Sequence, residues 1–194
     1  MAYFPAFLKI EGCPFLIIGD GKIAVRKMEI LREFGADVTI RKSFKPSDLE
    51  GKRVVIAAME DKELNHRIAE LCKEKGILVN AVDQIEDCTF IAPAYIKQGD
   101  VVAAFSSSGK SPVVAQYLKE KAKSFVTEEI SELTEVLGSL RSIAKENIAT
   151  EKERKAFFQE VLQLGIDKGE IPSKTEIEQI FLKFKKEKNY GMHN

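Results

Sequence analysis

The sequence predicts an α/β protein with a Rossmann-like parallel sheet domain, a small β dimerisation element after it, and a helical C-terminal domain. Three observations lead to this fold class. Short apolar, β-branched runs of the kind buried on both faces of a parallel sheet recur in the first 82 residues. Amphipathic stretches with helical spacing lie between them. After residue 112, the polarity pattern is helical almost to the end of the chain.

The first half of the chain alternates predicted strands and helices. Helices are expected at residues 22–35 and 62–75, where apolar side chains fall on one arc and Gly35 and Gly76 supply helix stops. The link at residues 42–52 is too short and polar for a full crossover helix, so this part of the sheet should be abbreviated. The predicted strands are 14–18 (PFLII), 37–41 (DVTIR), 53–58 (RVVIAA) and 77–82 (ILVNAV).

The pattern changes after about residue 88. "TFIAP" and "DVVAAFSSS" are expected to form two strands joined at Gly99-Asp100, and Ser111-Pro112 is typical of a helix start. Further helices are expected at 128–148, after the capping-box pair Thr150 and Glu153 with an end at Gly165, and after the pair Ser173 and Glu176. The predicted domains are 1–87, 88–112 and 113–194.

Composition excludes several classes of protein. The 30 basic and 30 acidic side chains cancel, which argues against nucleic acid or a membrane surface as the default partner. The chain lacks an apolar run of about 18 residues. Cys13, Cys72 and Cys88 are odd in number and widely spaced, and the chain has only two histidines, so neither a disulfide framework nor a metal site is expected. Cytoplasmic residence fits these features best.

The turn after the first predicted strand has the spacing Gly19-x-Gly21-x-x-Ala24. In a strand-turn-helix context this spacing favours a dinucleotide pyrophosphate over an ordinary glycine turn. The acidic residue that would bind the ribose of NAD is missing, because the second strand ends at Ile40-Arg41-Lys42. These cations could bind the 2′-phosphate of NADP or could simply be solvated charges, and both interpretations stay open.

Three further features could carry chemistry. Asp83 ends the fourth strand, where a carboxylate would face the ligand cleft, although Asp is also a routine turn residue. Lys27 lies inside an apolar helical arc, where a charge must either reach solvent or meet an anion, and Arg26 lies beside it. "FSSSGKSP", residues 105–112, could bind a carboxylate or phosphate, or could be a serine-rich turn with a helix cap.

Three segments together resemble the precorrin-2 dehydrogenase family, which includes the amino-terminal part of siroheme synthase. They are "FPAFLKIEGCPFLIIGDGKIAVRK", "VNAVDQIEDCTFIAP" and "FSSSGKSPVVAQYLKEK", and the similarity continues more weakly through "LRSIAKENIATEKERKAFF". The resemblance implies an NAD-binding Rossmann domain, a central β element that forms a homodimer, and oxidation of precorrin-2 to sirohydrochlorin. It also implies iron insertion in some members.

The resemblance assigns roles to residues. In the family, the aspartate at the position of Asp83 matters for activity, so Asp83 should take or relay a proton while the macrocycle passes a hydride to NAD. Precorrin-2 carries many carboxylates, and the implied tetrapyrrole site comprises Arg26, Lys27, Ser106, Ser107, Ser108 and Lys110. The implied cofactor site comprises Gly19, Asp20, Gly21, Lys22, Ile23, Ala24, Arg41, Ala58 and Met59, with no metal.

Two alternatives stay beside this interpretation. The segment after the second strand is shorter than is usual in the family, and Ala58-Met59 replaces a pattern with a threonine, so a module that binds NAD(H) or a tetrapyrrole without turnover is one alternative. A small-molecule oxidoreductase that uses NADP is the other, and Arg41 and Lys42 are its only support.

Overall fold

The computed structural model describes residues 3–185, which form two compact units. The first, here called the sheet unit, runs to Pro93 and also includes Ser106–Pro112. The second, here called the helical unit, comprises Ala94–Phe105 and the described chain from Val113 onward. The domain boundaries expected at residues 87 and 112 stay a prediction.

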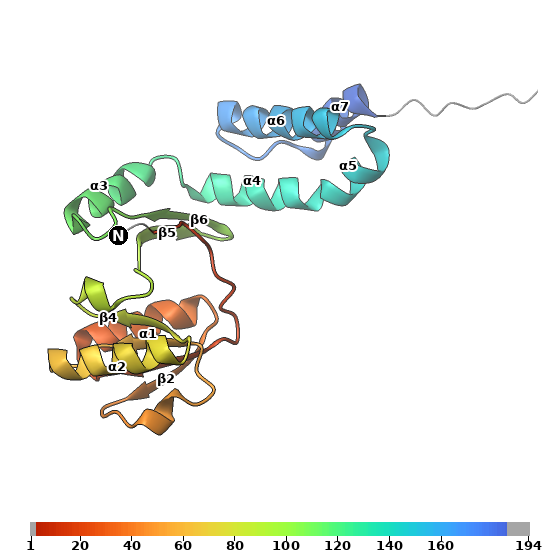
Figure 1. The fold of residues 1–194 in the computed structure, drawn as a ribbon. Coiled ribbons are helices and arrows are strands. Elements are labelled where there is room, and N and C mark those ends of the chain that lie inside the picture. The colour runs from red at the N-terminus through yellow and green to blue at the C-terminus, as the bar shows by residue number, and fades with distance from the viewer. Residues whose placement is uncertain (1–2, 186–194) are drawn as a thin grey trace, which may run out of the picture. The chain divides into compact units, whose positions relative to one another are not determined.

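The sheet unit contains a parallel sheet, as the sequence predicted (Figure 1). Its four strands lie in the order β2-β1-β3-β4. Its strands are β1 (Pro14–Ile18), β2 (Asp37–Arg41), β3 (Val54–Ala57) and β4 (Leu78–Ala81). The two crossover helices are α1 (Lys22–Glu33) and α2 (Lys62–Glu74). Gly35 and Gly76 follow these helices with φ of 80° and 66°, so both expected helix stops are confirmed.

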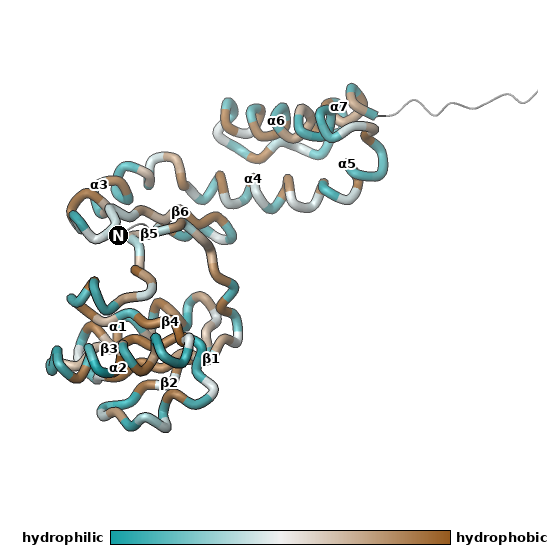
Figure 2. Tube along the Cα trace, viewed as in Figure 1, coloured by the Kyte–Doolittle hydropathy of each residue, from teal (hydrophilic) through white to brown (hydrophobic). Residues whose placement is uncertain are grey.

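Alternation along the strands builds one core on each face of this sheet. Leu16 and Ile18 pack with Ile68 and Cys72 of α2 on one face. On the other face, Phe15 and Ile17 of β1 pack with Ala24 of α1, and Met28 and Leu31 lie against the same cluster. Figure 2 shows the strands as the hydrophobic, brown part of this unit. Burial on both faces explains why the strands are apolar throughout.

The connection between β2 and β3 is abbreviated, as expected. It contains only the short 3₁₀ helix η1 (Pro46–Leu49), whose Leu49 is 2% exposed and joins the core beneath α2. A second 3₁₀ helix, η2 (Ile85–Asp87), follows β4. The connection between β2 and β3 therefore has no α-helix.

The hairpin of the helical unit begins later than predicted. Its strands are β5 (Ala94–Gln98) and β6 (Val101–Phe105), joined at Gly99-Asp100 as expected. The prediction of a strand at "TFIAP" is wrong, because residues 89–93 pack back onto the sheet unit. The amide of Thr89 donates to the carbonyl of Val79, and Phe90 lies against the core beneath α1.

The remaining helices of this unit are α3 (Pro112–Ala122), α4 (Glu128–Ser139), α5 (Arg141–Asn147), α6 (Glu151–Lys168) and α7 (Lys174–Phe184). The start of α3 at Pro112 and the capping boxes at Thr150 and Ser173 are confirmed. A core around the fully buried Phe157 joins α5, α6 and α7, with Leu137 and Leu140 packed against it.

Two helical predictions are wrong. The single helix expected at 128–148 is interrupted at Leu140, which ends α4 and precedes α5. Gly165 does not end α6, which continues to Lys168 and closes at Gly169, where φ is 65°. A Cβ at Gly165 would overlap the side chain of Leu133, so this glycine permits close contact between α4 and α6 instead. Across the described residues, every helix is too short or too polar to span a bilayer.

Candidate functional site

The glycine turn lies where the sheet changes direction. β1 has β2 on one side and β3 on the other, which is the switch point at which open parallel sheets bind ligands. The amide of Gly19 donates to the carbonyl of Arg41 over 2.8 Å. Gly19 has φ of 129°, and a Cβ there would overlap the carbonyl of Ala58. Only glycine therefore lets the chain pass between the ends of β2 and β3.

The start of α1 is suited to an anion. Its N-cap is Gly21, which offers no side chain to the first-turn amides, and the first turn contains no acidic residue. By contrast, Asp61 caps α2 by accepting from the amide of Leu64 over 3.1 Å. Ala24 is fully buried against the sheet, whereas Lys22 and Ile23 are exposed. A pyrophosphate could therefore receive hydrogen bonds from this turn without displacing a protein side chain.

The ends of β2 and β3 flank this turn. Lys42 pairs with Asp20 at 3.4 Å, and Arg41 approaches Asp48 at 4.0 Å. Ion pairs of this kind at the surface contribute little to the stability of the fold. Ala58 and Met59 follow β3 and are partly buried. The predicted cofactor residues thus gather around one edge of the sheet, with Arg41 and Lys42 at the end of β2.

Asp83 lies at the same edge, beyond β4. The amide of Val82 donates to the carbonyl of Ala57 over 2.9 Å, which places the end of β4 next to the end of β3. Asp83 is exposed and has φ of 59°, in the left-handed region that residues other than glycine rarely occupy. Strained backbone of this kind is often found at functional positions.

Lys27 reaches across the face of the sheet toward β4. Its ammonium donates to Oδ1 of Asn80 over 3.3 Å, and Asn80 itself is only 8% exposed. Burial lowers the pKa of Lys27, the nearby Cys88 and Asp83 oppose that effect, and Arg26 adds to it. Among residues 3–185, no carboxylate lies within ion-pair distance of this ammonium. A partly buried cation beside a neutral amide favours binding of an anionic ligand.

The serine turn belongs to the sheet unit and packs onto the loop that carries Asp83. Ser107 Oγ accepts from the amide of Ser111 over 2.8 Å, and Ser106 Oγ accepts from the amide of Ser108 over 3.0 Å. Ser108 and Gly109 have φ of 54° and 78°. A Cβ at Gly109 would overlap the side chain of Ile85, so the turn lies directly on the segment that follows Asp83.

The predicted tetrapyrrole residues therefore fall into two groups. Ser106, Ser108 and Lys110 are exposed on the serine turn, and Ser107 is partly buried because it holds that turn together. Arg26 is exposed on α1, beside the partly buried Lys27. Both groups belong to the sheet unit that contains Asp83 and the glycine turn.

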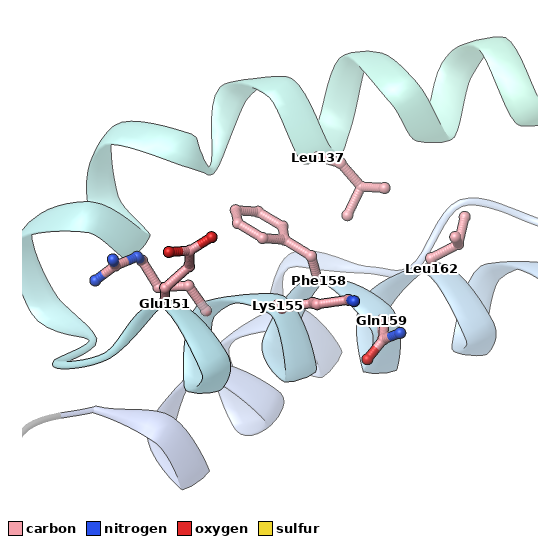
Figure 3. Close-up of a pocket in the computed structure, with 7 residues that line it drawn as sticks. Leu137, Glu151, Lys155, Phe158, Gln159 and Leu162 are labelled. Atoms are coloured by element: carbon pink, nitrogen blue, oxygen red, sulfur yellow. The ribbon is translucent and has the colours of Figure 1, made fainter.

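Two cavities lie in the helical unit. One, of about 390 Å³, lies between α4 and α6, where Leu137, Phe158 and Leu162 form an apolar wall beside Lys155 and Gln159 (Figure 3). The other, of about 520 Å³, lies among α4, α5 and α7. None of the predicted site residues lines either cavity. Within residues 3–185, no cluster of three histidine, cysteine or carboxylate side chains could hold a metal ion.

The site also contains polar residues that sequence reasoning missed. Asn65, Asn80, Gln84 and Asp87 are all less than 9% exposed, and each is hydrogen-bonded. Asn65 interrupts an apolar helix arc, and Asn80 interrupts an apolar strand. These interruptions are the sequence signal that could have identified both as buried polar residues. His66 of α2 lies beside this cluster, and its Nδ1 donates to Oδ1 of Asp87 over 2.7 Å.

His66 provides a test of this polar cluster through pH. The hydrogen bond and charge of Asp87 raise the pKa of His66, with further help from Glu70 and Glu63, while Lys73 also faces Asp87 at 3.7 Å. Since the folded-state pKa is raised, the charged pair stabilises the fold fully below the unfolded value of about 6.5 and loses its effect as pH rises through the raised value.

His66→Gln should therefore lower the thermal midpoint more at about pH 6 than at about pH 8.5. Calorimetric unfolding of the parent and the variant at both pH values measures the difference. In an Asp87→Asn background, the pH dependence of this difference should become much smaller, because only Glu70 and Glu63 then raise the pKa of His66. An equal difference at both pH values would show that the pair is not charged in the folded protein.

Three comparisons with known proteins bear on this site. A family model described as "Putative NAD(P)-binding" matches residues 6–43 and 40–94. Siroheme synthase 1 of Pectobacterium atrosepticum is 33% identical over an alignment of 180 residues that covers 82% of this chain and 38% of the relative. The siroheme synthase of Nitrosococcus oceani is 32% identical over an alignment of 187 residues that covers 86% of this chain and 40% of the relative. The chain thus spans about two fifths of the length of these relatives.

The fold has a solved counterpart. A structure titled "SirC, precorrin-2 dehydrogenase" superposes with a TM-score of 0.71, covers 94% of this chain and 98% of its own, and is 20% identical in sequence. At this identity, the match establishes the α/β fold with its hairpin and helical region. The chemistry depends on the residues of the site and not on the fold alone.

Proposed function

Because the chain belongs to the family of the siroheme synthase amino-terminal domain, we propose that it oxidises precorrin-2 to sirohydrochlorin with NAD as hydride acceptor. One observation carries this proposal. The sheet unit gathers the glycine turn, the strained Asp83 and the serine turn at one edge of its sheet. This edge is where ligands of open parallel sheets bind.

The proposal gives each group of residues a task. The glycine turn and the first turn of α1 hold the pyrophosphate, with Gly19 and Gly21 as the residues that let it approach. Oxidation of precorrin-2 removes a hydride and a proton, and the Asp83 carboxylate accepts that proton. Water can then take the proton from Asp83, because this side chain is exposed.

Cations supply the recognition of the tetrapyrrole. Precorrin-2 is a polycarboxylate, and Lys27 has a partly buried charge that a carboxylate would neutralise. Arg26 and Lys110 add exposed positive charge, and the hydroxyls of Ser106 and Ser108 add hydrogen-bond donors. The same site could accept pyrrole protons during iron insertion, so ferrochelatase activity is a secondary part of the proposal. A homodimer and cytoplasmic residence complete it, and the three free cysteines fit a reducing compartment.

The test is a direct assay. Purified protein mixed with precorrin-2 and NAD should produce NADH and the absorbance of sirohydrochlorin in equal amounts, and the same assay with NADP measures cofactor preference. Faster turnover with NADP would assign Arg41 and Lys42 to a 2′-phosphate. Calorimetric binding of tetrapyrrole or NAD without any product would instead support a non-catalytic binding module and overturn the proposed reaction.

A further inference from the structure

A buried polar chain connects the two loops on which the proposed reaction depends. It begins at Met59, whose amide donates to Oδ1 of Asn65 over 3.1 Å and whose carbonyl accepts from Nδ2 of Asn65 over 2.9 Å. The same Nδ2 group also donates to Oε1 of Gln84 over 3.3 Å. Asn65 is 1% exposed and Gln84 is 7% exposed. One side chain of α2 therefore bonds to the loop after β3 and to the loop after β4.

Gln84 carries the connection onward. Its Nε2 group donates to the carbonyl of Lys62 over 3.0 Å and to Oδ2 of Asp87 over 3.0 Å. The backbone amide of Gln84 donates to the carbonyl of Ala81 over 3.3 Å, and this bond closes the turn that contains Asp83. Asp87 is 3% exposed and completes the chain through its contact with His66.

These bonds leave Asp83 little freedom. Asp83 directly precedes Gln84, whose side chain is fixed at both its amide oxygen and its amide nitrogen. A left-handed residue other than glycine persists only where its surroundings over-determine it. Asp83 itself is exposed, so the constraint comes from the backbone bonds of the turn and from the neighbouring Gln84, whose buried side chain is hydrogen-bonded.

We propose that Asn65 and Gln84 are positioning residues that hold the proton-accepting Asp83 in register with the cofactor-binding loop at Met59. Asn65 sets the spacing of both loops, and Gln84 sets the conformation of the Asp83 turn alone. Neither side chain reaches the reacting atoms. The kinetic consequences of this inference rest on the proposed function. The coupling of the two loops through the side-chain amide of Asn65 is independent of that function.

The two residues predict different kinetic defects. Gln84→Met keeps the length of the side chain but removes its hydrogen bonds, so kcat should fall about 10- to 100-fold with little change in the Kd for NAD. Asn65→Ala releases both loops, so it should lower kcat by a similar factor and also weaken NAD binding about 5- to 10-fold. If Asn65→Ala does not fold, Asn65→Ser, which is too short to reach both loops, replaces it.

Cys72→Ala is the matched control. Cys72 lies two turns along α2 from Asn65, is also fully buried, and packs only in the apolar core on that face. Its truncation should lower stability without altering kcat or the Kd for NAD. If the Asn65 and Gln84 variants change both quantities no more than Cys72→Ala does, the inference is overturned.

Amide hydrogen exchange separates this inference from the proposed reaction, because it needs no ligand. Asn65→Ala should speed exchange at residues 58–60 and at residues 82–88, and Gln84→Met should do so only at 82–88. Exchange at the parent rate in both segments would refute the coupling, whatever the activity. If the parent protein makes no NADH but the two variants show this exchange pattern, the proposed reaction is refuted and the coupling of the loops stands.

Discussion

Asp83→Asn is expected to lower kcat for precorrin-2 oxidation by about 100- to 10,000-fold, the range typical of a lost general base. Asparagine keeps the size of the side chain and tolerates left-handed backbone, so the turn with φ of 59° should stay intact. What disappears is the charge that accepts the proton. The KM for NAD should change little, because the glycine turn is untouched.

Two variants control for other effects of this substitution. Asp83→Gly removes the carboxylate and at the same time relieves the left-handed strain, so it should be inactive but at least as stable as Asp83→Asn. Asp37→Asn alters an exposed aspartate at the opposite, amino end of β2 in the same sheet, and it should retain parent activity. Steady-state kinetics and thermal midpoints measure all three variants. Parent-like turnover by Asp83→Asn would remove Asp83 from the mechanism.

Most of the sheet unit could be predicted because its signals are local. The apolar runs are buried on both faces, so composition alone marked the four strands, and the glycines after α1 and α2 marked the helix ends. The glycine turn and Asp83 are likewise set by their place after a strand. The choice between NAD and NADP could not be made from the sequence, since Arg41 and Lys42 are exposed and form only surface ion pairs.

The errors occur where long-range packing overrides a local pattern. "TFIAP" is apolar enough for a strand, but Thr89 bonds to β4 and Phe90 packs beneath α1, so the hairpin begins only at Ala94. Gly165 has the identity of a helix stop, yet it lies inside α6 because Leu133 packs against it. Neither contact partner can be read from the neighbouring sequence.

The polar chain through Asn65 was missed for a related reason. Its members come from α2, from the loop after β3 and from the loop after β4, and each is an ordinary polar residue in its own segment. Only their burial distinguishes them, and burial of a polar side chain follows from the tertiary fold. Candidate site residues at strand ends are thus easier to predict than the buried polar residues beside them.

Gly19→Ala is expected to lower the free energy of unfolding by about 2 to 5 kcal/mol, the sum of backbone strain and overpacking. Gly19 has φ of 129°, and the added methyl group would overlap the carbonyl oxygen of Ala58 and lie 2.7 Å from its carbon. The backbone of Ala58, directly after β3, cannot move aside without breaking the hydrogen bond from its amide to the carbonyl of Ile18. NAD binding should be lost together with the turn.

Gly76→Ala and Gly21→Ala separate the causes of this effect. Gly76 has φ of 66° in open space, so alanine there should cost only about 1 to 2 kcal/mol from strain and leave NAD binding unchanged. Gly21 has φ of −70° and also has open space, so alanine there should change stability by less than about 0.5 kcal/mol. Its methyl group would nevertheless occupy the approach to the first amides of α1 and weaken NAD binding at least about 10-fold.

Calorimetric titration with NAD and denaturant unfolding of the three glycine variants measure these outcomes. The informative result is the contrast: Gly19→Ala loses stability and binding together, whereas Gly21→Ala loses binding alone. Because a Cβ at Gly21 would meet no protein atom beyond its chain neighbours within 4 Å, the added methyl group would act on the bound ligand and not on the packing of the protein. Parent-like NAD affinity in Gly21→Ala would mean that the pyrophosphate does not rest on this turn, and the proposed cofactor site would have to be placed elsewhere.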